Sequence, residues 1–182
     1  MLQSVLFPLR FLVLLWVIEL AKWFFRLQLI TFGIFPKEID GLKGILFAPL
    51  IHGDFMHLIS NSVPLLILGT ALFWLYPTIA VRVFVLCYIA TGMLVWLFAR
   101  PSYHIGASGL VYGLALFMMA IGFFKKDFLS IVVSVLVILL YGSILWGVLP
   151  TQPGVSFESH FFGAVSGIVS AYIFGSKNNK II

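Results

Sequence analysis

Long apolar runs separated by short polar segments dominate the pattern of this chain, and they predict six membrane-spanning helices. The expected ranges are Leu9–Gly33, His57–Tyr76, Thr78–Ala99, Ser108–Phe124, Phe128–Val148 and Glu158–Phe174. Most are close to the ~20 residues with which a helix crosses a hydrocarbon core about 30 Å thick. The sequence therefore predicts an all-α membrane protein in which six helices form a single domain over residues 1–182.

The segments between these runs differ in length. Very short turns at Pro77 and at 125–127 predict that the second and third spans, and the fourth and fifth, are antiparallel neighbours. The first loop is long, from about Ile34 to Met56, and contains an apolar stretch, Ile45–Ile51, that is too short to span. We expect this stretch to lie at the membrane interface or to enter the membrane partly.

Composition agrees with a membrane protein, because 62% of the residues are hydrophobic and only 9% are charged. The net charge of +5 is scattered between the apolar runs, so it indicates membrane topology and not nucleic-acid binding. We expect a multi-pass integral protein in contact with the lipid bilayer and with no nucleic-acid partner. The single cysteine, Cys87, excludes an intramolecular disulfide.

Basic residues predict the orientation. With the N-terminus inside, the cytoplasmic basic residues are Arg10, Arg82, Lys125, Lys126, Lys177 and Lys180. The outer loops then hold Lys37, Lys43 and Arg100. This excess on one side favours cytoplasmic positions for both termini.

Charged residues also occur inside the first span. Glu19, Lys22 and Arg26 lie at i, i+3 and i+7 and so share one helix face. We expect a Glu19–Lys22 pair that faces the bundle and an Arg26 side chain that reaches the outer surface. Because these charges interrupt the apolar run, we expect no cleavable signal peptide.

A serine in the segment Gly106–Gly109 opens the fourth span. A serine hydroxyl is a weak nucleophile alone, so catalysis by Ser108 needs a base, and His160 is the best candidate. Ser108 lies 17 residues before Lys125, and His160 lies 17 residues before Lys177. At ~1.5 Å per residue, both side chains should lie about 25 Å above the inner surface, at one depth.

Glycines indicate how the two helices meet. Gly109 and Gly113 are four residues apart on the fourth span, as are Gly163 and Gly167 on the last span. This spacing lets membrane helices approach closely, so one pair packed on the other would bring the serine and the histidine together. The alternative is that both pairs serve packing only.

Polar residues on the second span are candidates for binding a developing negative charge. His57 and Asn61 share a helix face, and both can donate hydrogen bonds, as the groups of an oxyanion hole do. His52 and His57 are five residues apart, which is not the spacing of a helical zinc site. We therefore expect neither a metal nor another cofactor.

Three residues near the serine and the histidine are interpreted separately. Tyr112 follows Ser108 by four residues, on the same helix face, and is placed to stack on the ring of His160. His104 lies in the loop before the serine and is interpreted as an ordinary polar loop residue. Glu158 precedes His160 by two residues and so points elsewhere on the helix; we interpret it as an outer-surface carboxylate.

Together these motifs resemble those of the rhomboid intramembrane serine proteases. The segment Gly106–Gly109 resembles the family's GxSG motif. The segment His52–Asn61 resembles its second-span motif, in which two histidines precede an asparagine. The segment His160–Gly163, with Gly167 further on, resembles its last-span histidine motif. Three motifs on three spans in the family's order extend the resemblance over nearly the whole chain.

The resemblance implies a rhomboid-like bundle and a Ser–His dyad without an acidic third member, with Ser108 as nucleophile and His160 as general base. It also implies supporting groups around them: the Ser108 backbone N–H, His57 and Asn61 at the oxyanion, Tyr112 against the base, His52 near the water-accessible cavity, and Gly106 where the loop approaches the substrate. The implied substrates are membrane proteins cut near the outer end of a transmembrane helix, and the implied location is a bacterial cytoplasmic membrane.

A substrate helix needs a way into the site from the lipid. We expect the fifth span to act as a mobile wall, because it has few obvious polar anchors. We expect the following loop, Leu149–Phe157, to act as a lid; it contains Pro150, Pro153 and Gly154.

The first outer loop departs from the family pattern. Many family members carry a Trp-Arg pair in the first outer loop, where this chain has Lys43-Gly44-Ile45 and Phe47-Ala48-Pro49.

Two other functions are considered. A non-catalytic rhomboid-like protein that binds or escorts transmembrane helices usually lacks the serine or the histidine, and this chain has both. A small transporter or channel is the third possibility, but the sequence has no inverted repeat and no paired broken helices.

Overall fold

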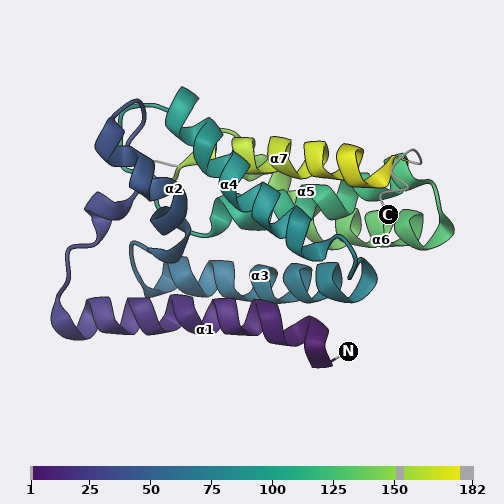
Figure 1. The fold of residues 1–182 in the computed structure, drawn as a ribbon, viewed down its shortest axis with the longest axis horizontal. Coiled ribbons are helices and arrows are strands. Elements are labelled where there is room, and N and C mark those ends of the chain that lie inside the picture. Colours follow the sequence, from purple (N-terminus) through teal and green to yellow (C-terminus); the bar gives the residue numbers. More distant parts are fainter. Residues whose placement is uncertain (1, 151–153, 177–182) are drawn as a thin grey trace.

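The computed structural model describes residues 2–150 and 154–176. The long helices of this part of the chain are α1 (Leu2–Phe25), α3 (Phe55–Leu75), α4 (Ala80–Phe98), α5 (Ser108–Lys125), α6 (Phe128–Tyr141) and α7 (Phe157–Gly175), bundled as Figure 1 shows. The short helical elements are η1 (Ile30–Phe32), η2 (Ile39–Lys43), α2 (Gly44–Phe47), η3 (Ala48–Leu50) and η4 (Gly142–Val148). The described ranges contain no strand, only an isolated antiparallel bridge between Ile34 and His104.

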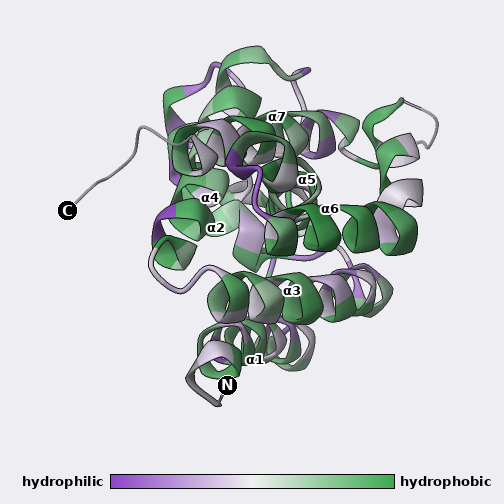
Figure 2. Cartoon of the chain, turned by 90° about the vertical axis from the view of Figure 1, so that its right-hand side faces the viewer, coloured by the Kyte–Doolittle hydropathy of each residue, from purple (hydrophilic) through white to green (hydrophobic). Residues whose placement is uncertain are grey.

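Five of the described helices are long and apolar enough to cross a membrane: α1, α3, α4, α5, and α6 continued by η4. In contrast, α7 is 19 residues long but carries Glu158, Ser159 and His160 near its start, which lowers its hydropathy. The helices are coloured mostly as hydrophobic in Figure 2, and their outward faces are apolar; Phe128, for example, is 84% exposed. A surface of this kind is stable only in lipid, so the chain is a multi-pass integral membrane protein.

The centre of the bundle is α5, most of whose residues are buried. Helix α7 lies along α5, and α4 packs on both; α1 and α3 lie side by side (Figure 1). Where α7 meets α5, a Cβ added to Gly163 would overlap the backbone of Gly109, and one added to Gly167 would overlap the Gly113 carbonyl. The two glycine pairs therefore bring the two backbones into direct contact. We call this the glycine seam.

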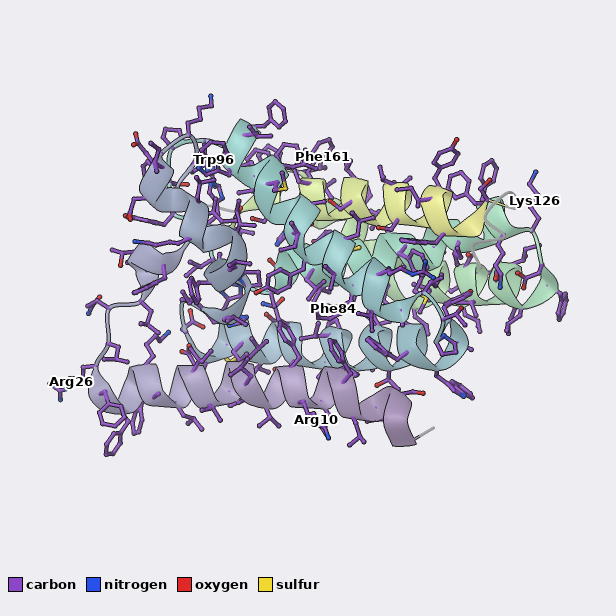
Figure 3. The ribbon with its side chains drawn as sticks, in the orientation of Figure 1. Arg10, Arg26, Phe84, Trp96, Lys126 and Phe161 are labelled. Atoms are coloured by element: carbon purple, nitrogen blue, oxygen red, sulfur yellow. The ribbon has the colours of Figure 1, made fainter. Side chains whose placement is uncertain are left out.

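The first helix differs from the prediction at both ends. It begins at Leu2 and not at Leu9, and it ends at Phe25 and not at Gly33. Arg26 has a left-handed backbone (φ 53°), which stops the helix, so Arg26 does not continue the charged stripe. It is exposed at one end of the bundle, opposite to Lys126 (Figure 3).

The predicted charge pair inside α1 is confirmed. Lys22 Nζ lies 2.7 Å from Glu19 Oε1, and Glu19 is buried. Lys22 also donates hydrogen bonds to the carbonyl oxygens of His52 (2.6 Å) and Gly53 (3.2 Å). The pair therefore fastens α1 to the segment that precedes α3.

Two predictions about neighbours have different outcomes. Helices α5 and α6 pack as an antiparallel pair, as expected, but α4 makes few contacts with α3 and packs mainly on α7.

The stretch 45–51 is too short to span, as predicted, and folds as α2 and η3. The first loop is fastened to α4, because Trp96 Nε1 donates to the Glu38 carbonyl (2.9 Å) and the Lys37 N–H donates to the Trp96 carbonyl (3.0 Å).

Candidate active site

Ser108 and His160 meet at one end of the glycine seam, where α5 and α7 begin. Ser108 is the first residue of α5, and His160 lies in the first turn of α7. Ser108 Oγ is 2.9 Å from His160 Nε2, and each residue is 9% exposed. A hydroxyl and an imidazole at this distance form the nucleophile–base pair that acyl-transfer chemistry requires.

The other ring nitrogen of His160 also has a partner. Its Nδ1 lies 2.8 Å from the carbonyl oxygen of Gly147, in η4. Tyr112 stacks on the ring, with centroids 4.2 Å apart and planes inclined by 5°. The ring is therefore fixed at both nitrogens and on one face. Sequence reasoning anticipated the stacking of Tyr112 but missed Gly147, because a backbone acceptor has no signature in the side-chain pattern.

The residues of α3 face the same space from the other side. Asn61 is buried, and its Nδ2 has no hydrogen-bond partner among the described residues. His57 Nδ1 accepts a hydrogen bond from the Gly53 N–H (3.4 Å), so the proton of the neutral ring is on Nε2. Both side chains line a cavity of about 420 Å³ together with Ser108. Two N–H donors that have no partner among the described residues and lie near a serine are suited to donate hydrogen bonds to an oxyanion.

Glycine is required at position 106. Its φ is +106°, a conformation that side-chain-bearing residues rarely adopt, and its N–H donates to the Ala48 carbonyl (2.9 Å). A Cβ at this position would lie 2.7 Å from His57 Nε2. Gly106 therefore lets the serine-bearing loop approach the ring of His57.

His52 lies behind the serine loop and does not line the cavity with His57 and Asn61. It is 1% exposed, and its Nε2 accepts a hydrogen bond from the Ala107 N–H (3.3 Å). Burial, with the neighbouring His57 and Lys22, lowers the pKa of His52 to about 3, so its ring is neutral at neutral pH. His52 thus supports the loop as a neutral acceptor. Within residues 2–150 and 154–176, no group of three or more potential metal-binding side chains comes together.

The interpretation of His104 as an ordinary loop residue is wrong. His104 is 1% exposed, and its Nδ1 lies 2.6 Å from Ser156 Oγ. Ser156 Oγ in turn caps α7 by accepting the Ser159 N–H (3.2 Å). Burial lowers the pKa of His104, which keeps its ring neutral and able to accept from the serine. The contact joins the loop before Ser108 to the start of the helix that bears His160.

Glu158 is also placed differently from the prediction. It is 7% exposed and not a surface carboxylate, and its Oε1 is 3.2 Å from Arg100 Nε. Arg100 additionally donates to the Val155 carbonyl (2.9 Å) and lies over the ring of Phe157. The pair ties the start of α7 to the segment that follows α4.

Two further hollows adjoin the dyad. One, of about 630 Å³, opens beside Ser108 and His160 between the start of α3 and the segment 154–156. The other, of about 310 Å³, lies between His160 and η4 and is bordered by Trp146 and Gly147. These two hollows and the cavity toward α3 are all lined by His160, and two of the three are also lined by Ser108.

The chain is similar to known proteins over most of its length. The family described as the rhomboid domain matches residues 40–177. Uncharacterized proteins of Mycobacterium tuberculosis and Mycobacterium bovis are each 36% identical over 181 residues, covering 94% of this chain and 75% of the relative. An uncharacterized protein of Mycobacterium leprae is 34% identical, covering 94% of this chain and 72% of the relative.

Proposed function

The chain belongs to the rhomboid family, and from this premise we propose that it is an intramembrane serine endopeptidase that cuts transmembrane-helix substrates near the outer membrane face. The observation that carries the proposal is the 2.9 Å contact between Ser108 Oγ and His160 Nε2. This pair lies beside a cavity that also contains uncommitted donors. A protein that only bound helices would not need a serine and a histidine in this relation.

In the proposed reaction, Ser108 Oγ attacks the carbonyl carbon of the scissile peptide bond while His160 Nε2 takes the hydroxyl proton. The tetrahedral intermediate then collapses, the C–N bond breaks, and the protonated imidazole gives its proton to the leaving amine. Water next attacks the acyl-enzyme ester, and His160 takes one of its protons. Collapse of the second intermediate returns that proton to Ser108 and releases the carboxylic acid.

The negative charge of each intermediate needs donors that are already in place. The Ser108 N–H, which has no α-helical acceptor at the start of α5, is one candidate. His57 Nε2–H and Asn61 Nδ2 are the others, because both line the cavity beside the serine. Donors fixed before the reaction stabilise the oxyanion without the cost of reorienting solvent.

The proposed topology has six spans, with α7 as the sixth and both termini in the cytoplasm. Arg82 in the first turn of α4, Lys125 at the end of α5 and Lys126 directly after it support this topology, because they lie at the same end of the bundle. Lys177 and Lys180 would add to this charge but lie outside the described residues. We further propose a single domain over residues 1–182, in a bacterial cytoplasmic membrane.

A substrate helix is proposed to enter from lipid between α3 and α6. The 420 Å³ cavity lies there and is bordered by Asn61 on α3, by Tyr141 at the end of α6 and by Ser143 in η4. We further propose that the loop 149–157 acts as a lid; its residues 151–153, which include Pro153, lie outside the described residues. Because a helical peptide bond is shielded, we expect small residues at the cut and helix-breaking residues nearby.

The test is cleavage of a model transmembrane substrate in liposomes by the wild type, Ser108→Ala and His160→Ala, each checked for folding. We expect both variants to lose at least about 10³-fold in rate. Ser4→Ala, far away on α1, is the matched control and should cleave at the wild-type rate. If the wild type cleaves no substrate of a broad panel but the transmembrane substrates co-purify with it, a helix-binding function replaces the proposal.

A further inference from the structure

We propose that the carbonyl oxygen of Gly147 positions the base, and that His160 is held in its reactive tautomer only while η4 packs against Tyr112 and His160. The inference rests on the proposed function, because it concerns the same dyad. It adds Gly147 as a third member to the pair of Ser108 and His160. Gly147 lies in η4, which borders the proposed entry route.

The tautomer follows from the partners of the ring. A carbonyl oxygen can only accept, so the 2.8 Å contact with Gly147 requires that His160 Nδ1 carries the proton. In the neutral ring, Nε2 then holds a lone pair, and this lone pair faces Ser108 Oγ at 2.9 Å. The opposite tautomer would direct a hydrogen at the serine oxygen, and the ring could not accept its proton.

No carboxylate takes this position in the described part of the chain. Glu158 is the nearest acidic residue in sequence, and its carboxylate is paired with Arg100. In serine proteases with a triad, an aspartate accepts from Nδ1–H and fixes the tautomer. Here the same geometric task falls to a neutral backbone acceptor, which orients the ring without adding charge.

Only glycine fits at position 147. A Cβ there would overlap the Tyr112 hydroxyl and would lie 3.4 Å from His160 Nδ1. Tyr112 cannot easily move away, because it is stacked on the imidazole ring. Any side chain at position 147 would therefore push η4 off the base and lengthen the orienting hydrogen bond.

The segment that carries this acceptor is weakly held. None of the η4 residues is buried, and Trp146 is 73% exposed. At its start, a Cβ added to Gly142 would meet no atom within 4 Å. Because Ser143 and Ile144 border the proposed entry cavity, a helix that enters there displaces η4 and removes the carbonyl from Nδ1. The base is oriented again once η4 closes over the bound substrate.

The first experiment reads the tautomer in the wild type. The chain has four histidines, so ¹⁵N-histidine labelling in detergent micelles gives few signals, and His160→Ala assigns one of them. We expect His160 to carry its proton on Nδ1 at a pH where the ring is neutral. A proton on Nε2 overturns the inference. The reading does not depend on activity, so it also separates this failure from a failure of the proposed protease function.

The second experiment compares two glycines of the same segment. Gly147→Ala should lower kcat on the order of 10²-fold with little change in KM, the loss expected when general base catalysis is disabled. Gly142→Ala, in open space, should keep the wild-type kcat. Labelling of Ser108 by a small fluorophosphonate should slow equally in Gly147→Ala, because this probe needs the base but not helix entry.

A compensating change distinguishes positioning from misfolding. In Tyr112→Phe/Gly147→Ala the hydroxyl that meets the new Cβ is gone, so η4 can return and kcat should recover at least tenfold relative to Gly147→Ala, part of the catalytic loss. The Nδ1–H signal should return with it. Equal kcat in Gly147→Ala and the wild type, or recovery of kcat without the Nδ1–H tautomer, would refute the proposal.

Discussion

Helices α7 and α6 both pack on α5, but in different ways. Along the glycine seam, α7 contacts α5 backbone to backbone at Gly163 and Gly167. In contrast, α6 is held mainly in its first half, where Ser134 accepts the Gly122 N–H (2.9 Å) and donates to the Met118 carbonyl (2.8 Å). Beyond Val137, no residue of α6 or η4 is buried.

The difference separates two requirements of the proposed reaction. The distance between nucleophile and base must stay constant, and the seam between the two helices that carry them is suited to this. A substrate helix must be admitted, and the wall beside the cavity is the part with the weakest packing. The expectation that this wall has few polar anchors does not hold near the start of α6, where Tyr76 also donates to Ser130 (3.1 Å). We therefore expect the start of α6 to stay in place when its other end moves.

The strongest test of this contrast joins the loosely held wall to α3. Ser60→Cys/Ser143→Cys, bridged by a thiol cross-linker across the cavity that both residues border, should lower cleavage of helical substrates on the order of 10²-fold or more, since lid opening is then blocked. Labelling of Ser108 by a small fluorophosphonate should persist. Cys87 is fully buried and does not interfere. Cleavage at the rate of the unbridged double variant would show that α6 is not the entry wall.

A smaller effect is expected from disturbing the seam itself. Gly163→Ala places a methyl group against the Gly109 backbone, which cannot yield, and overpacking of this kind costs about 1–3 kcal/mol. We expect a lower midpoint in thermal unfolding and a lower cleavage rate, because Ser108 and His160 are pushed apart. Gly154→Ala is not a suitable control, because its φ is +80°; Gly142→Ala is suitable. An unchanged unfolding midpoint in Gly163→Ala would mean that the helices are not in direct contact.

The smallest effect should come from the inner anchor of α6. Ser134→Ala removes two buried hydrogen bonds, one with the Gly122 N–H and one with the Met118 carbonyl, at a cost of about 1–2 kcal/mol. Ser143→Ala, at an exposed position in η4 just after α6, should change stability by less than about 0.5 kcal/mol. Thermal unfolding in detergent compares the two. Equal stability losses would contradict the idea that α6 is fixed at one end only.

Much of the site could be anticipated because it rests on helix periodicity. The i, i+4 spacing of Gly109 and Gly113, matched on α7, predicted the meeting of Ser108 and His160 that the structure has. The position of Tyr112 against the base follows from the same periodicity. Residues within one helix have relative positions set by the backbone, so their pattern carries the geometry.

Residues whose partners lie in another segment could not be placed in this way. Gly147 in η4 contacts His160 on α7, His104 in a loop contacts Ser156, and Glu158 on α7 pairs with Arg100. Their positions depend on how each loop folds back on the bundle, and the hydropathy pattern does not encode that path. The end of α1 was misplaced for a related reason, since a left-handed residue at position 26 stops a helix inside an apolar region.

Helix α1 carries no proposed catalytic group, but its Lys22 supports the site. Its ammonium group bridges the Glu19 carboxylate and the carbonyls of His52 and Gly53, the first two residues of the second-span motif. Removing α1 would leave those carbonyls without their donor and loosen the anchorage of His52, which accepts from the Ala107 N–H beside the serine. A fragment that contains only the helices with the three motifs would thus keep every proposed reacting group but lose the contacts that Lys22 makes beside His52. The minimal unit for engineering or reconstitution includes the first helix.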